Sequence, residues 1–111
     1  MQVINKTPHP LVLVVDDGAT LTIAPSLPPA RVTTSQDVVD TLLVAGIDIP
    51  VITMTTGSVI DLPDPAPDTI YVVSAVVRSA VADRKDVYSP GDLKRDPQGN
   101  VVGCSSLIAN N

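Results

Sequence analysis

The sequence contains no Phe or Trp and only two Tyr residues, Tyr71 and Tyr88. Its hydrophobic core must therefore be built from Val, Ile, Leu and Ala, and a core rich in β-branched residues favours strands. The single cysteine, Cys104, excludes an intramolecular disulfide, whereas small secreted domains usually depend on several. We therefore expect a protein of the reducing cytoplasm.

Positive charge is also scarce, because seven Lys and Arg residues face twelve acidic residues and the net charge is −5. Proteins that bind a nucleic-acid polymer use clustered Lys and Arg, so we do not expect DNA or RNA as a partner. The longest apolar runs fall far short of the roughly 20 residues of a membrane helix. The N-terminal segment meets Pro8 and Pro10 before any long apolar run, so we expect neither a membrane segment nor a signal peptide.

The length of 111 residues suits one domain. The pattern predicts an α+β fold, formed by residues 1–111 as a single compact β-rich domain with hairpins and one or two short helices. Apolar runs at 11–15 and 20–23 flank Asp16-Asp17-Gly18, which predicts a β-hairpin because Asp-Gly favours a tight turn. Residues 69–73 predict a buried central strand, and turn residues at 97–100 precede a last strand.

Residues 35–45 predict a short helix. Apolar residues between 38 and 43 have helical spacing, Thr34 and Asp37 occupy capping-box positions, and Gly46 follows as a stop signal. The same Val-rich segment also suits a strand, so both interpretations stay open.

The chain beyond this segment predicts a second hairpin over 49–60, with its turn at 56–58. Three prolines between 62 and 68 predict a stiff, extended loop. Ser74 follows the central strand and is expected to cap a helix over residues 75–81.

The junction around Ser74 carries the chain's most concentrated positive charge, Arg78, Arg84 and Lys85. A helix N-terminus offers free backbone N–H groups to an anion, and Arg binds phosphate through two hydrogen bonds. We therefore predict a pocket for a small anionic ligand, of nucleotide-like chemistry. The alternative is a solvated helix end whose cations pair internally with Asp83 or Asp86.

The single histidine, His9, lies between Pro8 and Pro10, which fix the local backbone. It is a candidate ligand contact or general base, because its ordinary pKa suits proton transfer. The alternative is an ordinary polar residue at the start of an edge strand. The full set of predicted ligand-binding residues is Thr7, His9, Arg31, Ser74, Arg78, Arg84 and Lys85.

Metal and cofactor sites are not expected, because one His and one Cys separated by 95 positions lack the spacing of a zinc site. Cys104 would become a nucleophile if His9 lay beside it. A small buried Cys in a strand is the interpretation that we favour. No catalytic residue is assigned, and a binding protein is favoured over an enzyme.

Short motifs spread over nearly the whole chain resemble those of a known protein family. In order they are Asn5-x-Thr7-Pro8-His9-Pro10, Ala24-Pro25-Ser26 with Ala30-Arg31-Val32, Gly57-x-Val59, Leu62-Pro63, Tyr71-Val72-Val73-Ser74 with Val77, Arg84-x-Asp86-Val87-x-x-Pro90, and Arg95-Asp96-x-x-Gly99-x-Val101-x-Gly103-Cys104. The chain resembles a family of small uncharacterised proteins from bacteriophages and prophage-bearing bacteria. The resemblance implies a phage accessory factor acting in the host cytoplasm. One such anti-defence class sequesters host immune signals such as cyclic oligonucleotides or ADP-ribose derivatives.

Three functions follow from these observations. The favoured one is a homo-oligomeric protein that binds a small phosphorylated ligand without turnover. The second is a phage structural or protein-interaction module that uses a sheet edge. The third is a nucleotide hydrolase or lyase in which His9 acts as acid or base.

Overall fold

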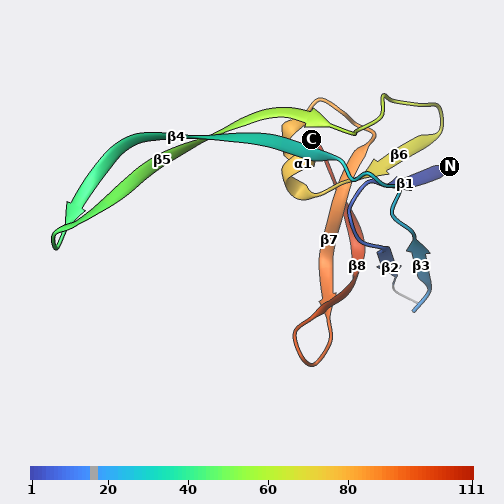
Figure 1. Ribbon diagram of the computed structural model, residues 1–111. Coiled ribbons are helices and arrows are strands. Elements are labelled where there is room, and N and C mark those ends of the chain that lie inside the picture. The colour runs from blue at the N-terminus through green and yellow to red at the C-terminus, as the bar shows by residue number, and fades with distance from the viewer. Residues whose placement is uncertain (16–17) are drawn as a thin grey trace.

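The computed structural model describes residues 1–15 and 18–111, which form a curled sheet with a long two-stranded arm (Figure 1). The Cα radius of gyration is 18.1 Å and the extents are 59 × 39 × 26 Å. A compact chain of this length has a radius of gyration of about 13 Å. The difference reflects the arm, which projects away from the sheet.

Six strands form the sheet, in the spatial order β1 (Gln2–Asn5), β6 (Thr69–Val72), β7 (Val87–Arg95), β8 (Val101–Ala109), β2 (Leu11–Val14) and β3 (Thr20–Ile23). The pairs β1–β6, β6–β7 and β2–β8 are parallel, whereas β7–β8 and β2–β3 are antiparallel. A parallel bridge joins Asn5 to Pro25, just beyond β3. The sheet therefore closes on itself at one end, where its two outer strands meet.

The arm consists of β4 (Arg31–Val44) and β5 (Ile47–Ile60), which pair antiparallel along their length. Ala45 and Gly46 connect them with φ values of 52° and 77°. Positive φ at both central residues is what a type I′ hairpin turn requires, and Gly46 adopts it without strain.

One helix, α1 (Ala75–Ala80), follows β6 in the described chain. Ser74 caps it, because its Oγ accepts a hydrogen bond from the backbone N–H of Val77 at 3.4 Å. The predicted helix and its cap are confirmed.

Two small hydrophobic clusters lie on opposite faces of the sheet, and Val72, the last residue of β6, and Val73, which follows it, belong to different clusters. Val73 packs with Ala30, Val77 and Val87, beside the base of the arm, whereas Val72 packs inside the curl. Consecutive residues in extended backbone point to opposite faces, which explains the division. The buried members of the second cluster are Leu11, Val72 and Cys104.

Several other predictions are confirmed. Residues 11–14 and 20–23 pair as an antiparallel hairpin, although Asp16 and Asp17 lie outside the described residues. Residues 69–72 form a buried strand between β1 and β7, and β8 follows the turn near 97–100. Residues 62–68 form the predicted connecting loop.

The predicted helix over 35–45 is wrong, because these residues belong to β4 and to the turn that follows it. A register shift between Val38 and Asp40 inserts one extra residue into β4. Such a bulge breaks the period-two alternation of a strand and produces spacing that resembles a helix. Gly46 is part of the hairpin turn rather than a helix stop.

The predicted hairpin over 49–60 is also wrong, since residues 47–60 form the single strand β5. Gly57 is not a turn residue. It belongs to a second bulge, this one in β5, where residues 57 and 58 lie opposite Thr33 alone and a Cβ at Gly57 would lie 2.4 Å from Oγ1 of Thr33. With eight strands and one six-residue helix in the described chain, the fold is mostly β rather than a balanced α+β arrangement.

Candidate functional site

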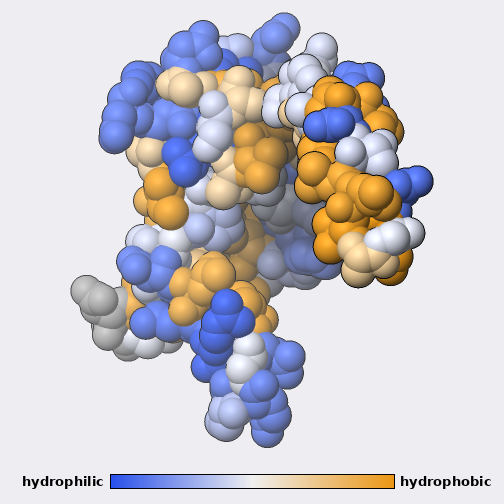
Figure 2. Space-filling model, turned by 90° about the vertical axis from the view of Figure 1, so that its left-hand side faces the viewer, coloured by the Kyte–Doolittle hydropathy of each residue, from blue (hydrophilic) through white to orange (hydrophobic). Residues whose placement is uncertain are grey.

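The arm displays a large set of apolar side chains to solvent. Nine large hydrophobic residues on it are 43 to 73% exposed: Val38, Val39, Leu42, Leu43, Val44, Ile47, Ile49, Ile52 and Met54. In Figure 2 the arm lies at the upper right and is largely orange, whereas the end of the β7–β8 hairpin at the bottom is blue. Two hairpins thus protrude, and the apolar one is the arm.

The strand register divides these side chains between the two faces of the arm. Near the tip, the pairs Leu42–Ile49 and Val44–Ile47 share one face. Nearer the body, Val38 pairs with Ile52 on the other face. Leu43, opposite Asp48, lies between Leu42 and Val44 and points to the face opposite theirs. Both faces of the arm therefore carry exposed apolar side chains.

The arm is also acidic. Apart from Arg31 at its base, the arm has no Lys, Arg or His, and residues 32–60 contain Asp37, Asp40 and Asp48. All three carboxylates lie at exposed positions. The arm therefore combines an apolar surface with negative charge.

A second feature is the corner at residues 7–10, which is built around the buried side chain of Asn5. Its Nδ2 donates to the carbonyl oxygens of His9 at 2.8 Å and Ile23 at 3.0 Å. Its Oδ1 accepts from the backbone N–H of Thr7 at 3.0 Å, and Oγ1 of Thr7 lies 2.6 Å away. One side chain therefore fixes how the corner presents His9.

This corner borders a pocket of about 730 Å³. The pocket is lined by Thr7, Pro8, His9, Pro10, Leu11, Val12, Ser74, Pro90, Leu93, Val101, Val102, Gly103 and Cys104. Its lining is mostly apolar, and it includes no Lys or Arg. Three of the predicted ligand-binding residues, Thr7, His9 and Ser74, therefore meet at one pocket.

Cys104 lines the same pocket as His9, but it has the properties of a core residue. It is 2% exposed, and its Sγ donates to the carbonyl oxygen of Val12 at 3.6 Å. Burial raises the pKa of the thiol, so the thiolate that a nucleophile needs is disfavoured. Cys104 therefore fits the structural interpretation.

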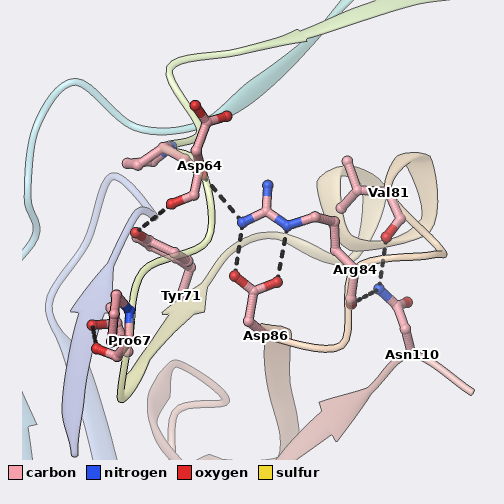
Figure 3. Close-up of polar contacts among 9 residues, drawn as sticks. Asp64, Pro67, Tyr71, Val81, Arg84, Asp86 and Asn110 are labelled. Carbon is pink, nitrogen blue, oxygen red and sulfur yellow. Dashed lines mark hydrogen bonds and ion pairs between the residues drawn. The ribbon is translucent and has the colours of Figure 1, made fainter.

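Two of the three predicted cations, Arg78 and Arg84, bind groups of the protein itself, and none of the three lines this pocket. The guanidinium of Arg84 binds both carboxylate oxygens of Asp86, at 2.9 and 2.8 Å, and also donates to the carbonyl oxygen of Pro63 (Figure 3). It lies 5.9 Å from the ring centroid of Tyr71. The hydrogen bonds from Arg84 hold the pKa of Asp86 below its ordinary value. Internal pairing, the alternative considered from the sequence, thus describes Arg84.

The remaining cations also lie apart from the pocket lining. Arg78 donates from Nε to Oγ of Ser89 at 2.8 Å and from a terminal nitrogen to Oδ1 of Asn110 at 3.2 Å. Arg31 is exposed at the start of β4, and Lys85 is exposed between Arg84 and Asp86.

Asn110 is a structural residue that the sequence gave no reason to single out. Besides accepting from Arg78, it donates from Nδ2 to the carbonyl oxygens of Val81 and Arg84, both at 3.0 Å (Figure 3). It therefore ties the end of the chain to the segment after α1.

The described residues contain no group of three or more His, Cys and acidic side chains that could hold a metal ion. Among them, no helix has both the length and the apolar character needed to span a bilayer. Comparison with known protein families, curated proteins and solved structures finds no match to the chain.

Proposed function

We propose that the protein is an interaction and assembly module, and that the arm is the element that docks on another protein chain. One observation carries this proposal, namely the nine exposed apolar side chains on an arm that leaves the body. Large apolar patches on a protein surface mark interaction sites. The motif resemblance to phage proteins adds the proposal that the module belongs to a phage assembly.

The free energy gained by burying these side chains supports a docking role for the arm. The nine side chains together expose the area of about five complete ones, and their burial is worth about 8–15 kcal/mol. Association costs about 4–15 kcal/mol in lost freedom. A partner that covers most of these nine side chains can therefore bind with a net gain in free energy, whereas one that covers only a few of them cannot.

Photocrosslinking tests this proposal. A benzophenone amino acid replaces Leu43 on the arm or, as a matched control, the exposed Leu21 on β3. We expect light to link the arm variant to a protein chain in cells that produce it, and the control to give a much weaker product. An arm that yields no protein crosslink above the control would refute the proposal, whichever protein is linked.

A second candidate function is the binding of a small anion at the pocket of about 730 Å³, a size typical of ligand sites. The observation that favours it is the meeting of Thr7, His9 and Ser74 at one pocket. It ranks second, because the lining lacks the Lys or Arg that phosphate recognition usually uses. In this proposal the ligand would be a nucleotide-like host signal that the protein sequesters.

Titration with ADP and with inorganic phosphate, followed by amide chemical shifts, tests the second candidate. We expect the amide signals of Thr7 and His9 to shift, and the shift at Thr7 to be lost in His9→Ala. Loss of ADP over time, with the same dependence on His9, would instead indicate a hydrolase or lyase. Unchanged shifts at millimolar ADP would count against both.

A further inference from the structure

The occupant of the arm can be inferred from this chain's own surface. We propose that the arm of one copy docks in the pocket of a second copy, beside the corner at residues 7–10, in a head-to-tail contact. This inference rests on the proposed function, because it names the partner of the same arm.

The pocket has the apolar character that the arm requires. Its lining includes Leu93, Val101 and Val102, which are each about half exposed. These residues lie on β7 and β8, close to the turn of a hairpin whose end is polar in Figure 2. The same molecule thus carries an apolar pocket with exposed walls and an exposed apolar arm.

The charges favour this contact over the pairing of two arms. Two arms side by side would bring six carboxylates together without an opposing cation in residues 32–60, and like charges repel. Beside the pocket, His9 lines the opening, and Lys94 and Arg95 follow Leu93 on β7.

The two acidic residues of the same hairpin are already bound within the chain. Asp92 accepts a hydrogen bond from Oγ of Ser106 at 2.8 Å. Asp96 accepts from the backbone N–H groups of Gln98 and Asn100, at 3.0 and 2.9 Å. Neither Lys94 nor Arg95 forms an ion pair within the described residues, but Arg95 already donates to the carbonyl oxygen of Gly99 at 3.0 Å. Lys94 is therefore the cation of this hairpin that is offered to a carboxylate of an incoming arm.

The position of the two surfaces fits a contact between copies rather than within one. In Figure 1 the arm leaves the body on one side of β7, and β2, which continues the pocket wall, lies on the other. The arm exposes about 300–600 Å² of apolar side chain. A stable interface buries about 800 Å² per partner, so the arm supplies most of the apolar part of one.

A contact that uses different surfaces on its two sides lets every copy both donate an arm and receive one. Such heterologous contacts close into rings when the rotation between copies allows it, and otherwise continue as filaments. The proposal therefore predicts assemblies larger than a dimer.

Complementation between two variants tests the proposal. The arm variant Leu42→Thr/Leu43→Thr removes two exposed apolar residues and keeps strand propensity. The pocket variant Val102→Asp places a carboxylate where the acidic arm would dock, and Leu93→Asp replaces it should Val102→Asp not fold. Leu21→Thr, on β3 and outside both surfaces, is the matched control. Urea unfolding checks that each variant is folded.

Analytical ultracentrifugation of each protein, and of the arm and pocket variants mixed 1:1, gives the readout. We expect wild type and Leu21→Thr to form large assemblies, and each single-surface variant to associate at least about 30-fold more weakly. The mixture should form a species of two chains and nothing larger, because one intact arm and one intact pocket remain.

Three results would overturn the inference: a wild-type chain that is monomeric at every concentration, a pocket variant that assembles like wild type, or a mixture that does not associate. The second would point to a symmetric contact between arms, and the third would show that an intact arm and an intact pocket do not bind each other. All three leave the proposed function standing if the residue at position 43 still crosslinks to another protein.

Discussion

Removing the arm should leave the body folded. The cut that the structure suggests joins Thr34 to Thr56, which face each other across the arm, through an Asn-Gly turn. Residues directly opposite in an antiparallel pair lie about 4.5–5.5 Å apart, which a two-residue turn spans. The arm residues that contribute to the first hydrophobic cluster, Val32 and Val59, are kept.

The expected change in stability is small and favourable. The removed stretch, residues 35–55, adds no residue to either hydrophobic cluster, and an isolated two-stranded hairpin is marginally stable at best. Shortening the connection from 21 residues to two lowers the entropy cost of closing it by about 2 kcal/mol. The trimmed chain should therefore be between equal to wild type and about 2 kcal/mol more stable.

Urea unfolding followed by tyrosine fluorescence measures this difference, because Tyr71 is buried in the body and the chain contains no Trp. Val73→Ala, in the buried cluster beside α1, is the control and should lose about 2–3 kcal/mol. A trimmed chain that is unfolded, or less stable than wild type by more than the control, would show that the arm is structural and would remove the main argument for docking.

Three further predictions follow from the polar contacts. Asp86→Asn should lose about 1–3 kcal/mol of stability at neutral pH. Because the pKa of Asp86 is lowered in the folded state, the difference from wild type should persist above its ordinary value of 3.8 and fade as the pH drops below it; a difference that is constant with pH would contradict the pairing with Arg84. Asn5→Ala should cost about 2–4 kcal/mol, because it removes the side-chain hydrogen bonds to the carbonyl oxygens of His9 and Ile23 and to the N–H of Thr7, although Oγ1 of Thr7 still donates to His9; urea titration will check this. Cys104 should react with a thiol reagent in native protein far more slowly than in urea, and rapid native labelling would show that the site is open.

Local patterns were enough to predict the part of the fold around Ser74. An apolar run followed by a capping residue and an alanine-rich segment specifies a strand and then a helix within a few residues, and the structure has both. The hairpin at 11–23 was predictable for the same reason, because its turn signal lies between its strands.

The arm was not predictable in this way, because its strand character depends on pairing at a distance. The apolar residues 38, 39, 42 and 43 fit a helix by spacing, and the bulge that creates this spacing is visible only once Val38 is placed opposite Ile52. A better signal was present at Ala45-Gly46, a short turn between two segments rich in β-branched residues. Reading Gly46 as a turn would have favoured one hairpin over residues 31–60.

Only the local part of the candidate site could be predicted, because the rest depends on contacts between residues distant in the sequence. The corner at 7–10 is local, and its proline-flanked histidine was evident. The role of Arg84 depends on its pair with Asp86, two residues away, and on the carbonyl of Pro63, which is distant in sequence. A cluster of cations in a sequence does not show which of them already have partners.

The separation of core and arm has a consequence for how this protein can change. Substitutions at the arm's exposed apolar positions meet no packing constraint from the body, so under the proposed function selection there acts through the docked chain. Such a protein can acquire a new binding partner through substitutions in the arm while the folding stability of the body stays constant. Because the arm does not contribute to the core, it could also be grafted between the facing ends of an antiparallel strand pair in another small protein.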